Sequence, residues 1–348
     1  MSAATAQRTQ ETPVPPAPPT SAVERVLKAR SLGIVLALVV LVAVTAAANP
    51  LFVSGQSLRD IALSTAILAI LAVGQTIVII TRSIDLSVGS VLGLSAYAAG
   101  SLLQAAPGTP IVVAIGLAML VGAACGLVNA VLVRFGGVPA LVVTLGTLYI
   151  YRGIAFFWAG GQQINADEMP GNYLGFGTAT VLGVPVLVLI AAVVLVVAGI
   201  VLGRYRAGRD LYAIGSNPDA AVLAGISVGR RLLAAFVVSG ALAGLAGALY
   251  AARFGTVDAA AGTGYELNVV AAAVVGGVVV TGGSGTVWGA ALGALLLTVI
   301  NSALPVLRID QFWQQAIVGA LILLAISTDR VLTTRLAAQL RRRNSHGR

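Results

Sequence analysis

Long apolar runs separated by short polar breaks fill the chain from residue 32 to residue 327. Ten such runs lie at 32–48, 61–80, 86–103, 111–133, 138–158, 181–202, 232–251, 267–280, 287–304 and 312–327. A helix that crosses a bilayer needs about 20 predominantly apolar residues. The pattern therefore predicts an all-α polytopic membrane protein with about ten transmembrane helices.

Two of the breaks between the runs are short and rich in small residues, at 81–90 and 281–286. Each joins two apolar runs, which predicts a weak internal repeat with re-entrant bends, an arrangement that places many transporter sites near the membrane midplane. The alternative is a plain Gly-rich turn between packed helices. Asp85 is expected to cap the helix that follows it, and a hinge carboxylate paired with Arg82 is the less favoured alternative. The residues that would form these hinges or turns are Arg82, Asp85, Ser87, Gly89, Gly282, Gly283 and Gly285.

The cations are distributed unevenly about the runs. If ten spans alternate in direction, most of the 21 Lys and Arg residues fall on one side, and Arg59, Arg152, Arg253 and Arg308 fall at or near the other. The positive-inside rule then predicts a multi-pass protein of the cytoplasmic (inner) membrane with both termini in the cytoplasm. The net charge of +9 reflects this topology and contact with membrane lipid, and it does not indicate a nucleic-acid partner.

The two ends of the chain differ from its apolar middle. Residues 1–30 are polar and rich in Pro, which predicts a disordered cytoplasmic tail because such a segment cannot bury a core. Residues 31–328 are predicted to form the transmembrane domain, and residues 329–348 a basic cytoplasmic tail. The stretch 203–231 is the longest polar interruption between runs and is too polar to span.

The amino-acid composition excludes most kinds of catalytic site. Hydrophobic residues make up 58% of the chain and charged residues 9%, whereas a soluble domain carries about a quarter charged residues. His346, Cys125 and Lys28 are each the only residue of their type, which excludes a His-based metal site, a Ser-His-Asp relay and an intrachain disulfide. The chain also lacks a Walker-type GxxxxGK[ST] loop. We therefore predict a protein that is not an enzyme and that binds no metal or cofactor itself.

The polar stretch 203–231 contains the signals of one short helix. Asn217, Pro218 and Asp219 have the order of an N-cap, a first helical residue and an acid in the first turn, and Gly225 is a stop signal. So short a helix is marginal alone in water. It would be stabilised by docking its apolar face into a groove of another protein, or it could lie on its own membrane domain.

This helix carries a resemblance to a known family. The run Asp219-Ala220-Ala221-x-x-x-Gly225 resembles the Glu-Ala-Ala-x-x-x-Gly signature of the coupling loop in permease subunits of ABC importers, with Asp in place of Glu. The segments 81–90, 144–147, 152–153, 215–226 and 262–287 are similar to the ribose/xylose/arabinose/rhamnose sugar permease family, which includes the autoinducer-2 permeases. The similarity covers residues 56–327. One departure is Arg82-Ser83, where many members have two glycines.

The resemblance implies partners and a function. Such permeases pair as two membrane subunits, identical or related, over a double-domain ABC ATPase that binds ATP and Mg, and an extracytoplasmic binding protein delivers the sugar. This chain would then move a monosaccharide or small polyol of the ribose, xylose, rhamnose or autoinducer-2 type. The residues that would couple it to the ATPase are Gly215, Asn217, Asp219, Ala220, Ala221, Gly225 and Ile226.

Uncharged polar residues inside the apolar runs are candidates for the solute pathway. A buried amide or hydroxyl is costly in lipid unless it meets a partner, and both groups can donate to and accept from a neutral polyol. Hydrogen bonds between helices are the alternative explanation for each of them. The candidates are Gln75, Thr76, Asn129, Thr144, Thr147, Asn268 and Asn301.

An ion-coupled secondary carrier is the alternative function, since such carriers also have about ten spans and internal repeats. They usually place carboxylates or His deep in the membrane, and the centres of the predicted runs lack both. A membrane-embedded hydrolase would need a His or a pair of acids within the apolar runs, and the runs contain neither, so this function is excluded.

Overall fold

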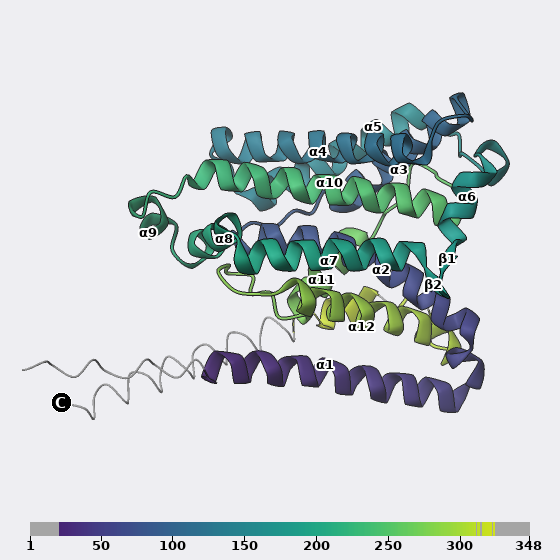
Figure 1. Ribbon diagram of the computed structural model, residues 1–348, viewed down its shortest axis with the longest axis horizontal. Helices are drawn as coiled ribbons and strands as arrows, with labels where there is room; N and C mark the ends of the chain where they lie inside the picture. The colour runs from purple at the N-terminus through teal and green to yellow at the C-terminus, as the bar shows by residue number, and fades with distance from the viewer. Residues whose placement is uncertain (1–20, 311, 314, 322, 324–348) are drawn as a thin grey trace, which may run out of the picture.

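The helices run side by side along one direction and form a single bundle (Figure 1). The computed structural model describes residues 21–310, 312, 313, 315–321 and 323. Across these residues, seven helices are long and apolar enough to cross a membrane, and two shorter apolar stretches accompany them. The protein is therefore an all-α, multi-pass membrane protein, as predicted.

The long helices follow the apolar runs. They are α1 (Ser21–Ala48), α2 (Gly55–Ile80), α3 (Val88–Ala105), α4 (Ile111–Gly136), α5 (Ala140–Ala159), α7 (Val186–Arg204), α10 (Val228–Phe254) and α12 (Val287–Val306), with the shorter α11 at Tyr265–Val275. Each predicted run up to 287–304 overlaps one of these helices. The run at 312–327 lies partly outside the described residues.

Short elements connect the long ones. They are the 3-10 helices η1 (Pro50–Val53) and η2 (Ala166–Glu168), the helices α6 (Gly171–Thr178), α8 (Arg206–Ser216) and α9 (Pro218–Leu223), and the strands β1 (Thr180–Val181) and β2 (Val184–Pro185). The two strands form an antiparallel hairpin. Leu182 and Gly183 turn it with positive φ angles of 51° and 81°, the conformation that a tight hairpin requires.

Two predicted boundaries are corrected. Helix α1 begins at Ser21, so residues 21–30 are helical and do not belong to a disordered tail. Helix α7 begins only after Pro185, because the hairpin takes the first residues of the predicted run 181–202. The predicted tails at 1–20 and 329–348 lie outside the described residues.

Helix α2 forms the centre of the bundle, and its residues from Ala66 to Ile80 are buried without interruption. Helices α10, α12, α7 and α11 pack around it, and α4 packs closely on α10. Small residues allow this last approach, since a Cβ atom added to Gly240 or Gly244 would collide with backbone oxygens of α4 at Gly122 and Ala118.

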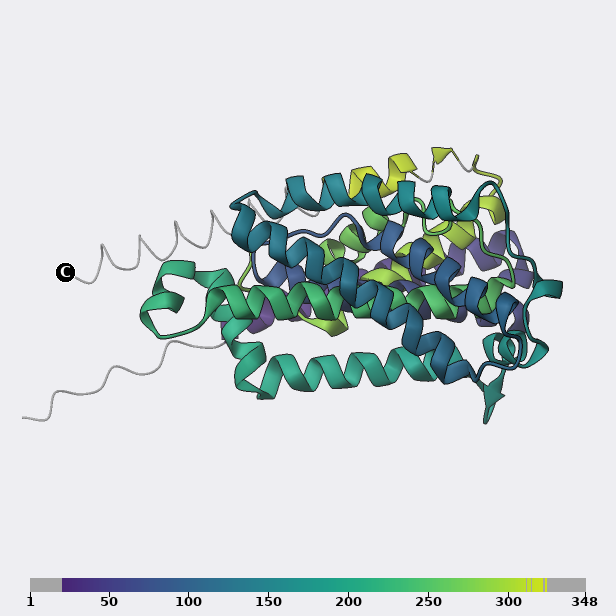
Figure 2. The same cartoon turned by 90° about the horizontal axis from the view of Figure 1, so that it is seen from above.

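The interrupted span is clearest at α11. This helix has 11 residues and is therefore about 16 Å long, which is too short to cross a hydrocarbon core of about 30 Å. The chain then continues as the irregular segment 276–286 before α12 begins. The corresponding break at 81–87 joins the longer α2 and α3. Figure 2 shows the bundle from above, with the loop that carries α9 extending beyond one end.

Candidate functional site

Helix α9 projects from the end of the bundle between α8 and α10 (Figure 1). The Oδ1 atom of Asn217 accepts hydrogen bonds from the backbone N–H groups of Asp219 and Ala220, both at 3.1 Å. The helix ends where Gly225 takes a φ of +77°, and the N–H of Ile226 closes the turn on the carbonyl of Ala221. The predicted start and stop signals of this helix are confirmed.

The apolar side chains of α9 face outward. Val222 is 60% exposed and Leu223 is 89% exposed, whereas Ala221 is buried on the side of the bundle. The helix therefore does not bury its apolar face on its own membrane domain, which was the alternative to docking on another protein. It offers a small hydrophobic surface at the end of the molecule.

Arg82 links this region to the break after α2. Its Nε atom donates to the carbonyl of Gly215 at 2.6 Å, and its Nη2 atom donates to the carbonyl of Ser216 at 2.7 Å. These carbonyls end α8, where a cation is favourable because the last carbonyls of a helix lack partners within it. Arg82 itself has a positive φ of 67°, a strained conformation for a residue with a side chain. It contacts α8 rather than Asp85.

The two breaks meet at the same point. The N–H of Gly283 donates to the carbonyl of Ile80 at 2.9 Å, and a Cβ atom added to Gly215 would collide with both of these residues. We call the contact among Ile80, Arg82, Gly215, Ser216 and Gly283 the junction. It brings the predicted hinge residues and the end of the predicted coupling segment into direct contact.

The other glycines predicted for the breaks surround the junction or lie against α11. Gly282 has a φ of +84° and adjoins the Arg82 side chain, and the carbonyl of Gly285 accepts a hydrogen bond from the Tyr212 hydroxyl at 2.9 Å. Gly89 has no room for a side chain, because it packs on Gly262 and on the Glu266 carboxylate.

A second set of predicted residues forms a buried network at the start of α3. The Oδ1 atom of Asp85 accepts from the Ser87 N–H at 2.9 Å and from the Ser87 hydroxyl at 2.6 Å. Asn129 donates to that hydroxyl at 2.8 Å and accepts from the Tyr151 hydroxyl at 3.2 Å. The Gln75 amide is oriented so that its nitrogen donates to the backbone carbonyl of Asp85 and its oxygen accepts from the backbone N–H of Asp85. We call this the inner polar network.

The three predicted threonines are also buried and paired. Thr144 donates to the carbonyl of Ile84 at 3.0 Å, which joins α5 to the break, while Thr76 and Thr147 donate to carbonyls of their own helices. Five of the seven pathway candidates, namely Gln75, Thr76, Asn129, Thr144 and Thr147, thus have partners inside the protein. For these five, hydrogen bonding within the bundle accounts for the polar side chain.

The other two candidates, Asn268 and Asn301, meet at a polar cavity of about 300 Å³ among α2, α11 and α12. The Oδ1 atoms of both residues are shielded and have no hydrogen-bond partner among the described residues. We call this the distal cavity. It is lined by Ser64, Leu68, Thr263, Tyr265, Asn268, Thr298, Asn301 and Ser302.

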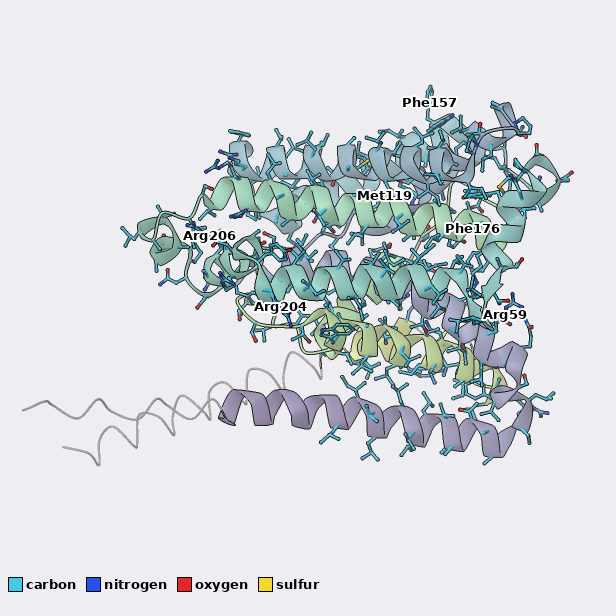
Figure 3. All side chains as sticks on the ribbon, viewed as in Figure 1. Arg59, Met119, Phe157, Phe176, Arg204 and Arg206 are labelled. Carbon is cyan, nitrogen blue, oxygen red and sulfur yellow. The ribbon has the colours of Figure 1, made fainter. Side chains whose placement is uncertain are left out.

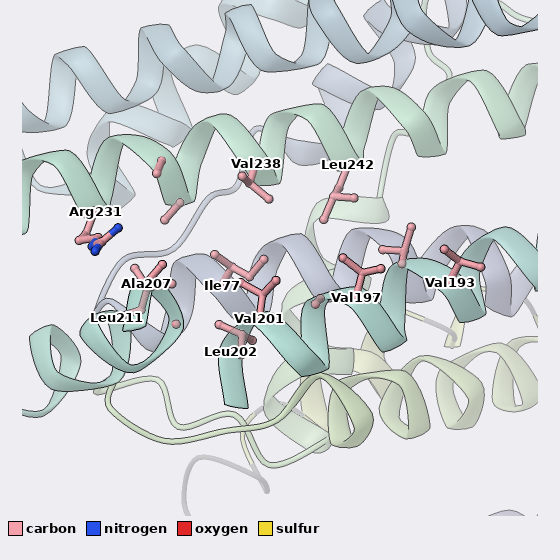
Figure 4. A pocket seen from close by; sticks show the side chains of 15 residues that line it. Ile77, Val193, Val197, Val201, Leu202, Ala207, Leu211, Arg231, Val238 and Leu242 are labelled. Atoms are coloured by element: carbon pink, nitrogen blue, oxygen red, sulfur yellow. The ribbon is translucent and has the colours of Figure 1, made fainter. Parts of the chain in front are cut away.

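A larger groove of about 390 Å³ has the opposite character (Figure 4). Val193, Val197 and Val201 of α7 face Val238 of α10 across it. Among the lining residues only Arg231 is charged, and it forms an ion pair with Asp210 at 2.6 Å. The apolar walls suit hydrocarbon and offer a polar solute nothing to bind.

Sequence reasoning missed several residues of these sites. Tyr151 of α5 donates to Asn129 of α4, and Tyr212 of α8 donates to Gly285 in the irregular segment before α12. Ser64, Thr298 and Ser302 line the distal cavity. The sequence does show that each of these hydroxyls lies within or next to an apolar run. It does not show which helix packs opposite the hydroxyl, and so it could not predict the partner. Among the described residues, no cluster of three or more His, Cys, Asp or Glu could hold a metal ion.

The apolar helices, the interrupted span and the projecting helix define the class of the protein as a polytopic membrane protein. Residues 57–326 match the family described as the permease component of the branched-chain amino acid transport system. The chain belongs to this family.

Relatives extend over most of the chain. It is 38% identical over 303 residues to the autoinducer 2 import system permease protein LsrC of Enterobacter sp. (strain 638), covering 87% of each chain. It is 37% identical over 302 residues to the ribose import permease protein RbsC of Haemophilus influenzae, covering 86% of this chain and 93% of the relative. The RbsC protein of Escherichia coli (strain K12) is 38% identical over 296 residues, with coverages of 84% and 92%. No solved structure matches the chain.

These relatives confirm the resemblance to sugar permeases of ABC importers. They are named as permeases of import systems rather than as enzymes, in agreement with the prediction of a transport protein.

Proposed function

We propose that this chain is the membrane-spanning permease subunit of an ABC importer for a monosaccharide or similar small polyol of the ribose, xylose, rhamnose or autoinducer-2 type. The similarity to ribose and autoinducer-2 permeases supports the solute class. The observation that carries the coupling is the capped helix α9, whose Val222 and Leu223 side chains are exposed at the end of the bundle. A surface of this kind fits a groove of a partner protein.

A separate double-domain ATPase supplies the energy by binding ATP and Mg and moving α9. In the permease, the junction transmits this movement, because Arg82 and Gly215 connect the end of α8 to the break after α2, and Gly283 connects it to the break before α12. Both interrupted segments then move with α9, and the pathway changes access from one side to the other.

The remaining partners follow from the same proposal. A second permease subunit, identical or related, completes the membrane part, and an extracytoplasmic binding protein delivers the solute. The end of the bundle that carries α9 faces the cytoplasm, and the opposite end faces outward from the inner membrane. The positive-inside rule supports this orientation, because Arg204 and Arg206 lie at the α9 end (Figure 3). Arg59 lies at the opposite end, on the side predicted for it (Figure 3). Both termini would then be cytoplasmic.

An ion-coupled secondary carrier is the second candidate, and the buried carboxyl of Asp85 is the observation that favours it. In carriers, such a group binds the coupling ion. Here Asp85 accepts two hydrogen bonds from Ser87, whose hydroxyl also accepts from Asn129, and this arrangement supports a structural role.

Two substitutions, one in α9 and one just after it, test the proposal by ATP-driven uptake in reconstituted vesicles. Gly225→Pro removes an N–H that donates to Val222 and requires a φ near −65° where the chain has +77°, and Asp219→Arg places a cation in the first turn. Both should abolish uptake while the protein remains in the membrane.

Gly225→Asn is the matched control, since Asn tolerates a positive φ, and it should keep most of the uptake. Normal uptake in both Gly225→Pro and Asp219→Arg would contradict the coupling role of α9.

A further inference from the structure

The apolar groove of Figure 4 lies between α7 and α10, and we call it the lateral groove. Both of these helices pack on the central helix α2, whose Ile77 also lines the groove. The side chains on the two walls are open to the surroundings, since Val197 of α7 is 54% exposed and Val238 of α10 is 43% exposed. The lateral groove is therefore an unfilled apolar channel on the side of the bundle.

The lateral groove is about as long as one leaflet of a bilayer is thick. Its lining on α7 runs from Val193 to Leu202, nine positions that correspond to about 14 Å along the helix. Half of a hydrocarbon core of about 30 Å is about 15 Å. Because α7 ends at Arg204, directly after the last lining residue pair, the groove lies in the leaflet on the α9 side.

Arg231 is the only charged residue of the groove, and it lies at the end near α8 (Figure 4). Its side chain is 32% exposed. Its Nε and Nη2 atoms both donate to the Oδ2 atom of Asp210, at 2.9 and 2.6 Å, whereas its Nη1 atom donates to no group among the described residues. The guanidinium group thus has a free donor at the end of an apolar channel.

The surroundings of this end are positively charged. The pair of Arg231 and Asp210 is neutral as a whole, but Arg206 and Arg230 are exposed beside it in the chain. Helix α8 begins at Arg206 without a side-chain cap, and Ala207 in its first turn lines the groove, so the helix dipole also favours an anion here. A molecule that fits the groove is apolar over most of its length and anionic at this end.

A helix from a second copy of the chain would fit the charges poorly. Arg134 and Arg204 lie in the last turns of the exposed apolar helices α4 and α7. Gly229 at the start of α10 adjoins the Arg134 side chain, so α4 ends on the same side as the charged end of the groove. Either helix of a second copy, in the same membrane orientation, would bring a further arginine to Arg231. An anionic lipid brings the opposite charge.

We propose that the lateral groove binds an acyl chain of an anionic phospholipid from the leaflet on the α9 side. The lipid phosphate accepts a hydrogen bond from the Nη1 atom of Arg231. Since Arg231 also holds α8 through Asp210, the bound lipid stabilises the position of the helix that leads into α9. This site depends on neither the ATPase nor the transported solute.

Native mass spectrometry of the full chain, purified in a non-ionic detergent, tests the site by counting bound lipids. The chain is titrated with phosphatidylglycerol or with phosphatidylcholine that has the same acyl chains. Phosphatidylglycerol should bind about tenfold more tightly, because only its headgroup carries a net negative charge.

A larger side chain in the groove should displace the acyl chain. Val197→Trp should weaken the binding of both lipids about tenfold, because the ring occupies the channel between α7 and α10. The matched control is Val196→Trp, which places the same ring at the neighbouring position of α7, exposed but outside the groove. It should leave the binding of both lipids unchanged.

A second variant tests the headgroup contact. Asp210→Asn combined with Arg231→Gln removes the guanidinium without leaving a buried carboxylate unpaired. It should lower the affinity for phosphatidylglycerol to that for phosphatidylcholine and leave the latter unchanged, which also shows that the protein is folded.

Three results would overturn the proposal. They are equal affinities of the unaltered chain for the two lipids, unchanged binding of phosphatidylglycerol in Val197→Trp, and a persisting preference for phosphatidylglycerol in the double variant. A dimer that Val197→Trp dissociates without loss of bound lipid would assign the groove to a second copy instead. A failure of ATP-driven uptake would leave the lipid site unaffected.

Discussion

The inner polar network and the distal cavity use the same residue types in different ways. In the network, the Asn129 amide donates to Ser87 and accepts from Tyr151, and the residue is fully buried. In the cavity, Asn301 leaves its amide oxygen without a partner. A polar side chain inside an apolar run can therefore hold helices together through paired atoms or leave an acceptor unpaired, and its hydrogen-bond partners distinguish the two cases.

The largest expected difference concerns stability. Asn129→Leu removes the buried hydrogen bonds that this amide forms with Ser87 and Tyr151, so it should lower the free energy of unfolding by about 2 kcal/mol. Asn301→Leu removes an unpaired oxygen and should change it by less than about 0.5 kcal/mol. The measurement is the midpoint of unfolding of the purified chain by SDS in mixed micelles. A similar loss in both variants would remove the distinction between the two regions.

The next effect concerns the junction, which adjoins the network. Arg82→Gly relieves the positive φ but removes both hydrogen bonds to α8, so the protein should fold while ATP hydrolysis becomes less coupled to uptake. We expect the number of solute molecules imported per ATP to fall about tenfold, because the two hydrogen bonds that join the break to α8 are lost. The ratio is measured in vesicles that contain the permease, its ATPase and the binding protein.

Arg82→Lys keeps the cation at the end of α8 and should recover part of the ratio. An unchanged ratio in Arg82→Gly would show that the junction does not transmit the movement.

The smallest expected effect is the pH dependence of the exposed loop that contains Glu168, where the paired polar groups are in contact with water. Glu168 accepts hydrogen bonds from the Asn165 N–H and from Gln104, both at 2.7 Å, and the backbone bond is the main cause that lowers the pKa of this exposed carboxyl. Because the folded pKa is lowered, the stabilisation of the loop is present above the ordinary pKa of about 4.3 and is lost as the pH falls below it.

Hydrogen exchange of the Asn165 N–H should therefore accelerate slightly as the pH falls through this range, after correction for the intrinsic rate. In Glu168→Gln this additional change should be absent. A pH response of equal size in both proteins would exclude Glu168 as its cause.

The fold was predictable where the pattern is local. The apolar runs predicted the long helices, and the N-cap Asn217 with Gly225 predicted α9, because both signals depend on neighbouring residues only. The short α11 was not recognised as a half-length helix, since the apolar run continues to residue 280 although the helix ends at Val275. Hydrophobicity alone cannot distinguish a helix from buried irregular backbone.

The hydrogen-bond partners of the predicted site residues could not be derived from the sequence. The seven polar candidates were selected because each lies within or next to an apolar run, and that criterion cannot separate Asn129 from Asn301. The surroundings of each candidate depend on residues far away in the chain. Asn129 is paired with Tyr151, whereas Asn301 lies at the same cavity as Ser64 and its amide oxygen is unpaired. The contact of Arg82 with Gly215 likewise joins distant segments of the chain.

The central claim is that α9 connects this permease to an ATPase, and co-purification tests it most directly. The chain is expressed together with a candidate double-domain ATPase and extracted in detergent, with Gly225→Pro and Gly225→Asn as paired variants. We predict one complex for the unaltered chain and for Gly225→Asn, and its loss in Gly225→Pro. A chain that purifies alone and moves solute down an ion gradient would contradict the claim and favour the secondary carrier.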